Sequence, residues 1–185
     1  MGYGVILTGS PGVGKTTCVL KVVQSLKRSG VQVGGFYTQE VRVEGRRIGF
    51  KIVDVQSGRE GWLAKINGGS GPRIGKYLVM LGDLNEIGVA ALRKALTDPR
   101  VQVIVVDEVG PMEMVSDAFK KTVEEVTRRG NVFLFTVHWS MADRFAVKAR
   151  EKAAITLIHL TYINRDEAPA NILNIVNSFL RDRAE

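Results

Sequence analysis

The chain has 185 residues, 45% of them hydrophobic and 24% charged, and its formal net charge is +7. This length is enough for one well-buried domain and short for two, and the composition is that of an ordinary globular protein. No run approaches the roughly 20 apolar residues of a membrane-spanning helix, and the single cysteine, Cys18, excludes an internal disulfide and a cysteine-clustered zinc site. We therefore expect one cytoplasmic domain over residues 1–185, with no membrane association.

The positive charge fits two kinds of partner. Nucleic acid favours such a bias, and so does a small ligand that carries several negative charges. The basic residues are spread out, with pairs such as Arg46-Arg47 and Lys120-Lys121 but no long tract. A small anionic ligand is therefore favoured, and nucleic acid stays the less favoured partner.

The first part of the chain reads as strand, helix, strand. Val5 to Thr8 is a β-branched run that ends in glycine and predicts a strand. Between Thr16 and Arg28 the apolar residues fall on one helical face, and Gly30 suits the left-handed residue that follows a helix end. Residues 31–37 then predict a second strand.

Residues 41–72 have a different pattern. Short runs at 41–43, 46–55 and 60–66 are separated by tight glycine turns, which predicts a small antiparallel meander beside the main sheet. The glycine-rich stretch 67–72 cannot hold a regular element, so it is either a mobile surface loop or a lid.

The next helix is predicted from its end signals. Asp83 has the character of an N-cap, with Glu86 three residues later, and the helix runs toward Leu96 until Asp98-Pro99 stops it.

Apolar runs at 101–106, 132–137 and 155–160 predict strands that are buried on both faces. Amphipathic helices are predicted at 116–129, which Gly130 closes, and at the C-terminal end of the chain. Alternating strands and helices imply parallel pairing with helices on both faces. We predict one α/β domain with a mainly parallel central sheet.

The strongest motif is the phosphate-binding loop, or Walker A sequence, Gly9-Ser10-Pro11-Gly12-Val13-Gly14-Lys15-Thr16. It follows a predicted strand and opens a predicted helix. Its glycines allow successive N–H groups to point at an anion, and the helix adds the positive end of its dipole. We expect the loop to hold a triphosphate, with Lys15 between the β- and γ-phosphates and the Thr16 hydroxyl on Mg²⁺.

Two residues beside the motif are less specific. Thr17 either contacts the α-phosphate or favours the start of the helix. Cys18 is interpreted as a packing residue of that helix.

Two carboxylates follow the strand predicted at 101–106. Ligands of open α/β sheets bind at the carboxyl ends of the strands, so Asp107 is expected to bind Mg²⁺, directly or through water, as the partner of Thr16. Glu108 has two interpretations: it accepts a proton from the attacking water, which favours hydrolysis, or it pairs with an arginine. Glu113 either orders the site or is a solvated loop carboxylate.

Several basic residues are candidates for the γ-phosphate. An arginine that contacts the developing charge accelerates phosphoryl transfer by about 10³–10⁵. The candidates are Arg42, Arg46, Arg47, Arg59 and Arg73, and any single one of them is more often a solvated surface arginine. His138 follows a buried strand and either senses the γ-phosphate or is a satisfied strand-end histidine, whereas His159 lies inside an apolar strand and is expected to be structural.

Asn164, Arg165 and Asp166 follow the last predicted strand. An asparagine amide can read the edge of a base, and a guanidinium can stack on its ring. The alternative is a turn in which Asp166 caps the last helix.

Taken together, these segments resemble the THEP-type, or cancer-related, nucleoside-triphosphatase family of P-loop proteins. The resemblance runs nearly end to end, and its most specific parts are Gly35 to Arg42 and Gly45 to Phe50. It implies the additional-strand, RecA-like branch of the three-layer fold, with strand 132–137 between the phosphate-loop strand and the Asp107 strand. Pro111 and His138-Trp139 depart from the residues that the family usually has there.

The resemblance also implies an activity. This is Mg²⁺-dependent hydrolysis of ATP, GTP, CTP and UTP to the diphosphate and phosphate with low base selectivity, in which Glu108 activates water beside Lys15. Asn164 and Arg165 then become the base-side contacts, and we expect a monomer. The alternative is a P-loop kinase that transfers the γ-phosphate to a small molecule or a nucleic acid.

Overall fold

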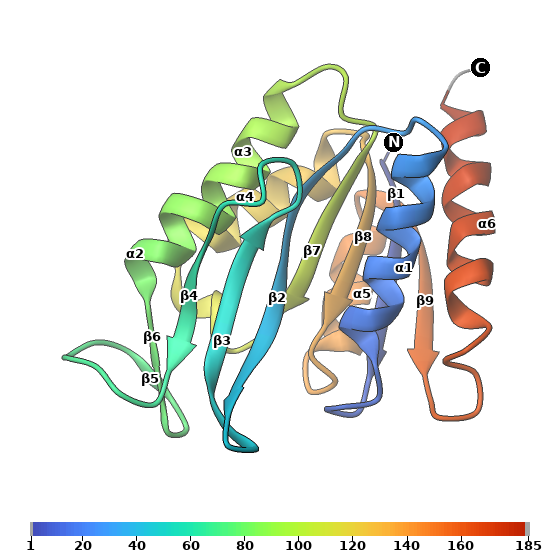
Figure 1. Ribbon diagram of the computed structural model, residues 1–185. Helices are drawn as coiled ribbons and strands as arrows, with labels where there is room; N and C mark the ends of the chain where they lie inside the picture. The colour runs from blue at the N-terminus through green and yellow to red at the C-terminus, as the bar shows by residue number, and fades with distance from the viewer. Residues whose placement is uncertain (1, 184–185) are drawn as a thin grey trace.

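The computed structural model describes residues 2–183 (Figure 1). The strands are β1 (Gly2–Gly9), β2 (Val33–Val43), β3 (Arg46–Asp54), β4 (Glu60–Lys65), β5 (Arg73–Ile74), β6 (Tyr77–Val79), β7 (Val103–Val109), β8 (Val132–Val137) and β9 (Ala153–Leu160). The longer helices are α1 (Lys15–Arg28), α3 (Ala90–Thr97), α4 (Asp117–Arg128), α5 (Ala142–Arg150) and α6 (Ala168–Asp182). Shorter helical segments are α2 (Leu81–Asp83), the π-helix η1 (Leu84–Val89) and the 3₁₀ turn η2 (Glu113–Val115).

The nine strands within residues 2–183 belong to one mixed sheet, in the order β5-β6-β4-β3-β2-β7-β8-β1-β9. The strands from β2 to β9 in this order are parallel, whereas β3, β4, β5 and β6 add to the edge of β2 in antiparallel fashion. Strand β8 lies between β1 and β7, with Leu134 opposite both Val5 and Val105. The predicted α/β fold and its central strand order are confirmed.

Helices cover both faces of the sheet and make three layers (Figure 1). Helices α1 and α6 pack against one face through residues such as Val19 and Ile172, whereas α3, α4 and α5 pack against the other through residues such as Phe119. Removing each large aliphatic or aromatic side chain from water contributes about 1.5–3 kcal/mol, so the two layers together fix the strand ends on which the site is built.

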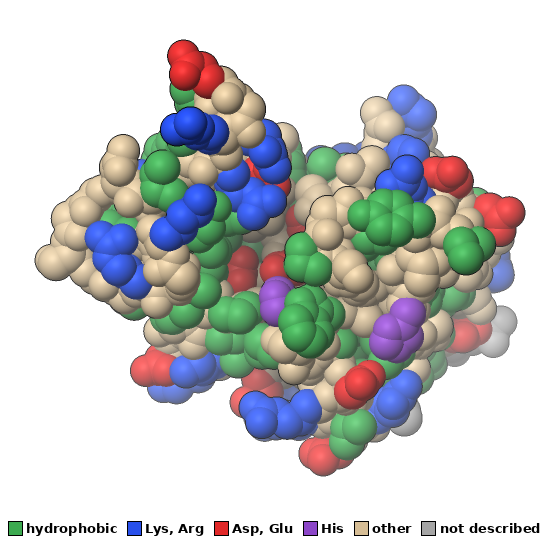
Figure 2. All heavy atoms as spheres, turned by 90° about the horizontal axis from the view of Figure 1, so that it is seen from below, with side chains coloured by type: hydrophobic (Ala, Val, Ile, Leu, Met, Phe, Trp, Pro, Cys, Tyr) green, Lys and Arg blue, Asp and Glu red, His purple; other side chains and the backbone are tan. Residues whose placement is uncertain are grey.

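The antiparallel strands continue the main sheet instead of forming a separate unit. Strand β2 pairs with β7 from Val33 to Phe36 and with β3 from Phe36 to Val43. The separate strands expected at 31–37 and 41–43 are therefore one strand of 11 residues. We call β3 to β6, together with the outer half of β2, the antiparallel extension. It forms one lobe of the molecule, and the surface is hollowed between this lobe and the rest (Figure 2).

The helix predicted to begin at Asp83 begins earlier, at Leu81. The Asp83 carboxylate accepts a hydrogen bond from the backbone N–H of Trp62 at 2.7 Å and thereby ties the helix to β4. The N-cap prediction was wrong because this partner, distant in sequence, engages the carboxylate.

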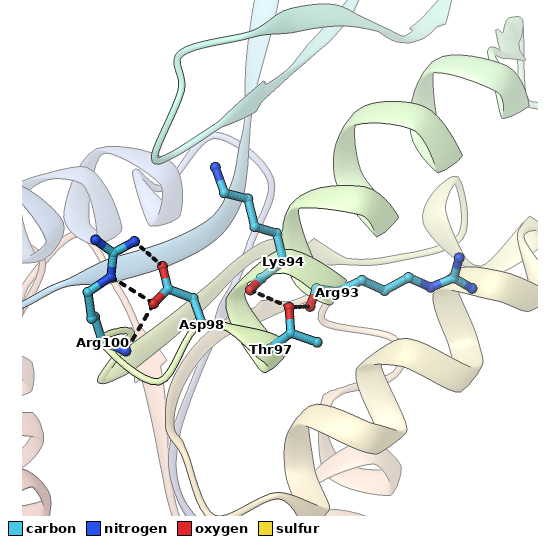
Figure 3. Close-up of polar contacts among 5 residues, drawn as sticks. All are labelled: Arg93, Lys94, Thr97, Asp98 and Arg100. Carbon is cyan, nitrogen blue, oxygen red and sulfur yellow. Dashed lines mark hydrogen bonds and ion pairs between the residues drawn. The ribbon is translucent and has the colours of Figure 1, made fainter.

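The predicted end of the same helix is confirmed. Asp98 follows α3, and its carboxylate accepts hydrogen bonds from the backbone N–H and the guanidinium of Arg100 (Figure 3). These bonds to Arg100 lower the pKa of Asp98 to about 2. The Thr97 hydroxyl donates to the carbonyl oxygens of Arg93 and Lys94, 3.1 Å away in each case.

Three features of the C-terminal part differ from expectation. Helix α5 was not predicted, although Ala142, Ala146 and Ala149 form a buried stripe along it. Strand β9 ends the sheet and is mostly half-buried, so it is not a doubly covered strand, and His159 on it is exposed. Helix α6 begins at Ala168 without a side-chain cap from the described residues, so the capping role of Asp166 was wrong.

No helix within residues 2–183 is long and apolar enough to cross a membrane.

Candidate active site

The phosphate-binding loop lies between β1 and α1, as the motif requires. Gly12 and Gly14 have φ values of 78° and 111°, a left-handed conformation that glycine adopts without strain. Helix α1 has no acidic residue in its first turn, so the positive end of its dipole is not neutralised there. The Lys15 ammonium donates to the carbonyl oxygens of Gly9 and Ser10, at 3.0 and 3.3 Å. The loop thus concentrates N–H groups and one cation over a small concave surface.

Thr17 and Cys18, which directly follow the phosphate-binding loop, lie in different surroundings. Thr17 is exposed and lines the cleft described below, so it remains available to a phosphate. Cys18 is buried in the face of α1 that meets the sheet, and burial raises the pKa of its thiol to about 11, which agrees with a packing role.

Asp107 lies near the carboxyl end of β7, two residues before the strand ends, and is only 2% exposed. Its Oδ2 accepts hydrogen bonds from the Thr16 hydroxyl at 2.8 Å and, at 3.4 Å, from the Thr38 backbone N–H. Its Oδ1 accepts one from the Thr136 hydroxyl at 2.5 Å. Burial raises the pKa of Asp107, and the two hydroxyl bonds oppose that shift. The fold therefore brings Thr16 and Asp107, 91 residues apart, into direct contact.

This pair fits a magnesium ion. A hydroxyl and a carboxylate are hard oxygen donors, and Mg²⁺ in nucleotide sites takes one or two such protein ligands beside phosphate oxygens and water. Within residues 2–183, no group of three or more His, Cys, Asp or Glu side chains forms a site that encloses a metal by protein alone.

Two further carboxylates converge next to Asp107. Burial raises the pKa of Glu108 to about 7, with a contribution from the Asp107 charge; the charge that opposes the shift is that of Lys15, not that of an arginine. Glu113 is only 2% exposed, so it is not a solvated loop residue; burial and Glu108 raise its pKa well above its ordinary value. A Cβ atom on Gly110 would lie 2.9 Å from Glu108 Oε1 and 3.1 Å from Glu113 Oε2. Both carboxylates therefore lie close to the Gly110 backbone, in space that a side chain at this position would occupy.

These groups form the floor and one wall of a cleft of about 1070 Å³, whose opposite wall is the antiparallel extension. Acidic side chains lie deep in the hollow, a histidine lies at its rim, and basic side chains lie on the lobe of the extension (Figure 2). The lining residues from the extension are Thr38, Gln39, Glu40, Val41, Arg42, Arg47, Phe50, Lys51, Leu63, Ile74, Gly75 and Tyr77.

Known proteins resemble this chain in sequence and in fold. A family model described as NTPase matches residues 4–173. The nucleoside-triphosphatase THEP1 of Thermofilum pendens is 40% identical over 176 residues, which are 95% of this chain and 96% of that protein. The nucleoside-triphosphatase THEP1 of Methanosarcina acetivorans is 42% identical over 178 residues, 96% of this chain and 97% of that protein.

The chain belongs to the NTPase family. This confirms the predicted resemblance and, with it, the prediction that the chain is an enzyme. Solved structures agree. The crystal structure of THEP1 from Aquifex aeolicus matches with a TM-score of 0.78 and 31% identity, over 94% of this chain and 99% of that one. The solution structure of a human cancer-related nucleoside triphosphatase matches with a TM-score of 0.76 and 36% identity, over 95% and 98%.

The structure sorts the arginine candidates of this NTPase. Arg42 and Arg47 line the cleft, whereas Arg46, Arg59 and Arg73 are not among its lining residues. Residues 67–72 do not line it either, so the glycine-rich loop lies outside the site in this conformation.

His138 lines the cleft and is half-buried. Its Nδ1 lies 2.8 Å from the Ser140 hydroxyl oxygen, and burial, with the charge of Lys15, lowers its pKa. A largely neutral imidazole next to Lys15 is compatible with either of its two predicted roles.

Asn164 holds the loop between β9 and α6. Its side-chain oxygen accepts the Thr161 N–H at 2.8 Å, and its amide nitrogen donates to the His159 carbonyl oxygen at 2.9 Å. The Arg165 guanidinium carbon lies 5.1 Å from the centre of the Tyr162 ring. Leu160, directly before this loop, is opposite Gly9 in the sheet, so the loop neighbours the phosphate-binding loop. The turn role is confirmed, and the base-side role of Asn164 and Arg165 stays a prediction.

Sequence reasoning missed some residues of the site. Thr136 is a hydroxyl inside an otherwise apolar strand, one residue before its end, and this was a signal that pointed to a buried polar contact. The Thr38 backbone N–H and the Phe50–Tyr77 pair carry no such signal, because long-range strand pairing brings them to the cleft.

Proposed function

We propose that this NTPase hydrolyses the bond between the β- and γ-phosphates of ATP, GTP, CTP and UTP in the presence of Mg²⁺. The observation that carries the proposal is the contact between Thr16 and Asp107 at 2.8 Å, next to the half-buried Glu108 and in the same cleft as the phosphate-binding loop. In this proposal the phosphate-binding loop binds the nucleotide, Thr16 and Asp107 bind the metal, and Glu108 activates the water.

Binding begins at the phosphates. The N–H groups of residues 9–16 and the start of α1 surround the β-phosphate, and Lys15 neutralises charge between the β- and γ-phosphates. Thr16 and Asp107 would hold the magnesium ion, which would supply positive charge to offset that of the phosphate oxygens.

Glu108 orients the attacking water and accepts its proton. It is adjacent to the metal-binding carboxylate in sequence but lies with Glu113 beside Gly110, so it is free for this separate task. General bases work best when their pKa lies near the operating pH, and burial brings the pKa of Glu108 to about 7.

Low selectivity for the base follows from the loop after β9. Asn164 already makes one backbone hydrogen bond with each end of its amide, which leaves it only part of its capacity to read a base edge. Arg165 and Tyr162 present flat groups that stack on any base. We further propose that the enzyme works as a monomer, because the cleft within a single chain already brings the phosphate-binding loop, Asp107 and Glu108 together.

The test is steady-state phosphate release from each of the four nucleoside triphosphates, with product analysis and with Mg²⁺ removed by a chelator. We expect all four to yield diphosphate and phosphate with kcat/KM values within about tenfold of one another, because the Asn164 amide is partly engaged by backbone and stacking on Arg165 and Tyr162 does not depend on the base. The chelator should abolish release.

Two results would contradict the proposal. Hydrolysis of a single nucleotide would contradict the low selectivity. Transfer of the γ-phosphate to an added acceptor faster than to water would favour the kinase instead.

A further inference from the structure

Three charged residues of the antiparallel extension form a cluster on the cleft wall that faces the phosphate-binding loop. Glu40 Oε2 pairs with Arg47 Nη2 at 2.9 Å, and Glu40 Oε1 pairs with Arg42 Nε. Arg42 Nη1 also donates to the Gly45 carbonyl oxygen at 2.8 Å, in the turn of the hairpin. We call Glu40, Arg42 and Arg47 the Glu40 cluster. Its carboxylate holds two guanidinium groups in place.

The cluster is tied to the metal end of the site through one strand. The Thr38 backbone N–H donates to Asp107 Oδ2, so β2 passes directly beside the metal-binding carboxylate. Glu40 follows two residues later, which is about 7 Å along a strand. All five residues from Thr38 to Arg42 line the cleft, as does Arg47. Arg47 is on the neighbouring strand β3, opposite Arg42 of β2, so it lines the cleft beside the strand that contacts Asp107.

Arg47 and Arg42 differ in the donors they have left. Both Nε and Nη1 of Arg42 are engaged, and its side chain is 53% exposed. Arg47 is 38% exposed, yet its Nε is buried and has no hydrogen-bond partner among residues 2–183. Arg47 therefore keeps a guanidinium donor that the described residues do not use, whereas the Nε and Nη1 donors of Arg42 are already engaged.

Two aromatic side chains of the antiparallel extension restrict where this guanidinium lies. The Arg47 guanidinium carbon is 5.4 Å from the centre of the Phe50 ring, and Phe50 makes an edge contact with Tyr77 at 5.3 Å. A guanidinium held on one side by a carboxylate and below by a ring is oriented before a ligand arrives, which lowers the entropy lost on binding.

We propose that Arg47 is a catalytic residue that donates hydrogen bonds to the γ-phosphate oxygens in the transition state, and that Glu40 and Arg42 position it. This rests on the proposed hydrolysis. In that reaction the water oxygen forms a bond to the γ-phosphorus and its proton passes to Glu108. The bond to the bridging oxygen breaks, and the diphosphate leaves with the electron pair. Charge on the γ-phosphate oxygens is stabilised by the Arg47 guanidinium from within the same chain.

The test compares neighbouring arginines of β3. Arg47→Ala should lower kcat for Mg·ATP by at least about 10²-fold, toward the 10³–10⁵ that such arginines contribute, with little change in KM. Arg46→Ala is the matched control, because Arg46 is the adjacent residue, is exposed and does not line the cleft; it should keep the wild-type kcat. Affinity for Mg·ADP should be unchanged in both variants.

Further measurements separate catalysis from folding. Mg·ADP with aluminium fluoride, which mimics the transferring phosphoryl group, should bind to the wild type much more tightly than Mg·ADP alone, and Arg47→Ala should lose that gain. Low concentrations of guanidinium should partly restore the turnover of Arg47→Ala. Arg47→Lys should restore little, since lysine lacks the planar fork.

Glu40→Gln tests the positioning role. It should lower kcat less than Arg47→Ala does, and the double variant should be no slower than Arg47→Ala, because both changes act through the same group. A kcat for Arg47→Ala within about threefold of the wild type, or an equal loss of Mg·ADP and Mg·ATP affinity, would overturn the assignment. Failure of the proposed function is distinct, because the wild type itself would then release no phosphate.

Discussion

On the phosphate-loop side of the cleft, the functional groups come from the carboxyl ends of parallel strands, whereas on the extension side they come from side chains along β2 and β3. The first wall is buried: Asp107 and Glu113 are each 2% exposed. The second is open to solvent, with Glu40 and Arg47 at 33% and 38%. The buried wall, with its backbone donors and fixed carboxylates, suits the binding of nucleotide and metal. The charged side chains of the open hairpin suit a contact to the γ-phosphate that is made in the transition state.

Lys15→Ala should produce the largest change in binding, since it removes the cation of the phosphate-loop wall. A hydrogen bond to a charged group contributes about 1.5–3 kcal/mol, so affinities for Mg·ATP and Mg·ADP should both fall by roughly 10- to 100-fold in titration calorimetry. Lys21→Ala, which removes an exposed lysine of the same helix, should change neither.

Lys15→Ala should lower the affinity for Mg·ADP, whereas Arg47→Ala should leave it unchanged, so the two variants test the two walls separately. If Lys15→Ala lowered turnover while Mg·ADP affinity stayed at the wild-type value, the division of labour between the two walls would be wrong.

Thr136→Val should produce a moderate loss of stability. The variant keeps the shape of the side chain but removes the hydroxyl that donates to Asp107 Oδ1 at 2.5 Å. A buried oxygen without its donor costs about 1–3 kcal/mol, which urea denaturation would measure in the nucleotide-free protein. Thr136→Ser keeps the donor and should retain most of the wild-type stability. Equal stability of the valine and serine variants would show that the hydroxyl contributes nothing to holding the carboxylate.

Glu113→Gln should produce an effect that is visible as a change in the pH dependence of stability. The pKa of Glu113 is raised in the folded state, mainly by burial. Such a carboxyl contributes its full stability below its unfolded pKa and loses that contribution as the pH rises through its folded pKa. The free energy of unfolding of Glu113→Gln should therefore increase relative to the wild type between about pH 5 and pH 8, as denaturant titrations would show.

Glu151 is exposed and provides the control. The free energy of unfolding of Glu151→Gln should differ from that of the wild type by the same amount at every pH in this range. A difference between Glu113→Gln and the wild type that shrinks as the pH rises would contradict the assigned direction of the shift.

Most residues of the phosphate-loop wall can be predicted from the sequence, because short contiguous motifs identify them. The motif from Gly9 to Thr16 carries its own geometry, and the apolar run before Asp107 places that carboxylate at a strand end. The position of β8 between β1 and β7 came from the family resemblance, and the pairing of Leu134 with Val5 and Val105 confirms it.

The sequence predicted the antiparallel strands of the extension, but it did not predict that they form one wall of the cleft. Arg46 and Arg47 are adjacent and chemically identical, and only strand register decides which of them lines the cleft. The same limit explains the error at Asp83, whose partner Trp62 is 21 residues away. The edge position of β9, and with it the exposure of His159, likewise depends on sheet order rather than on local pattern.

Single-turnover release of phosphate by Glu108→Gln, measured beside its affinity for Mg·ATP, tests the assigned mechanism most directly. Glutamine keeps the size of the side chain and its place beside Gly110 but cannot accept the proton. We predict an affinity within about threefold of the wild type and a rate lower by about 10²–10⁴, which is what a general base contributes. Release at the wild-type rate would contradict the assignment of Glu108 as the base.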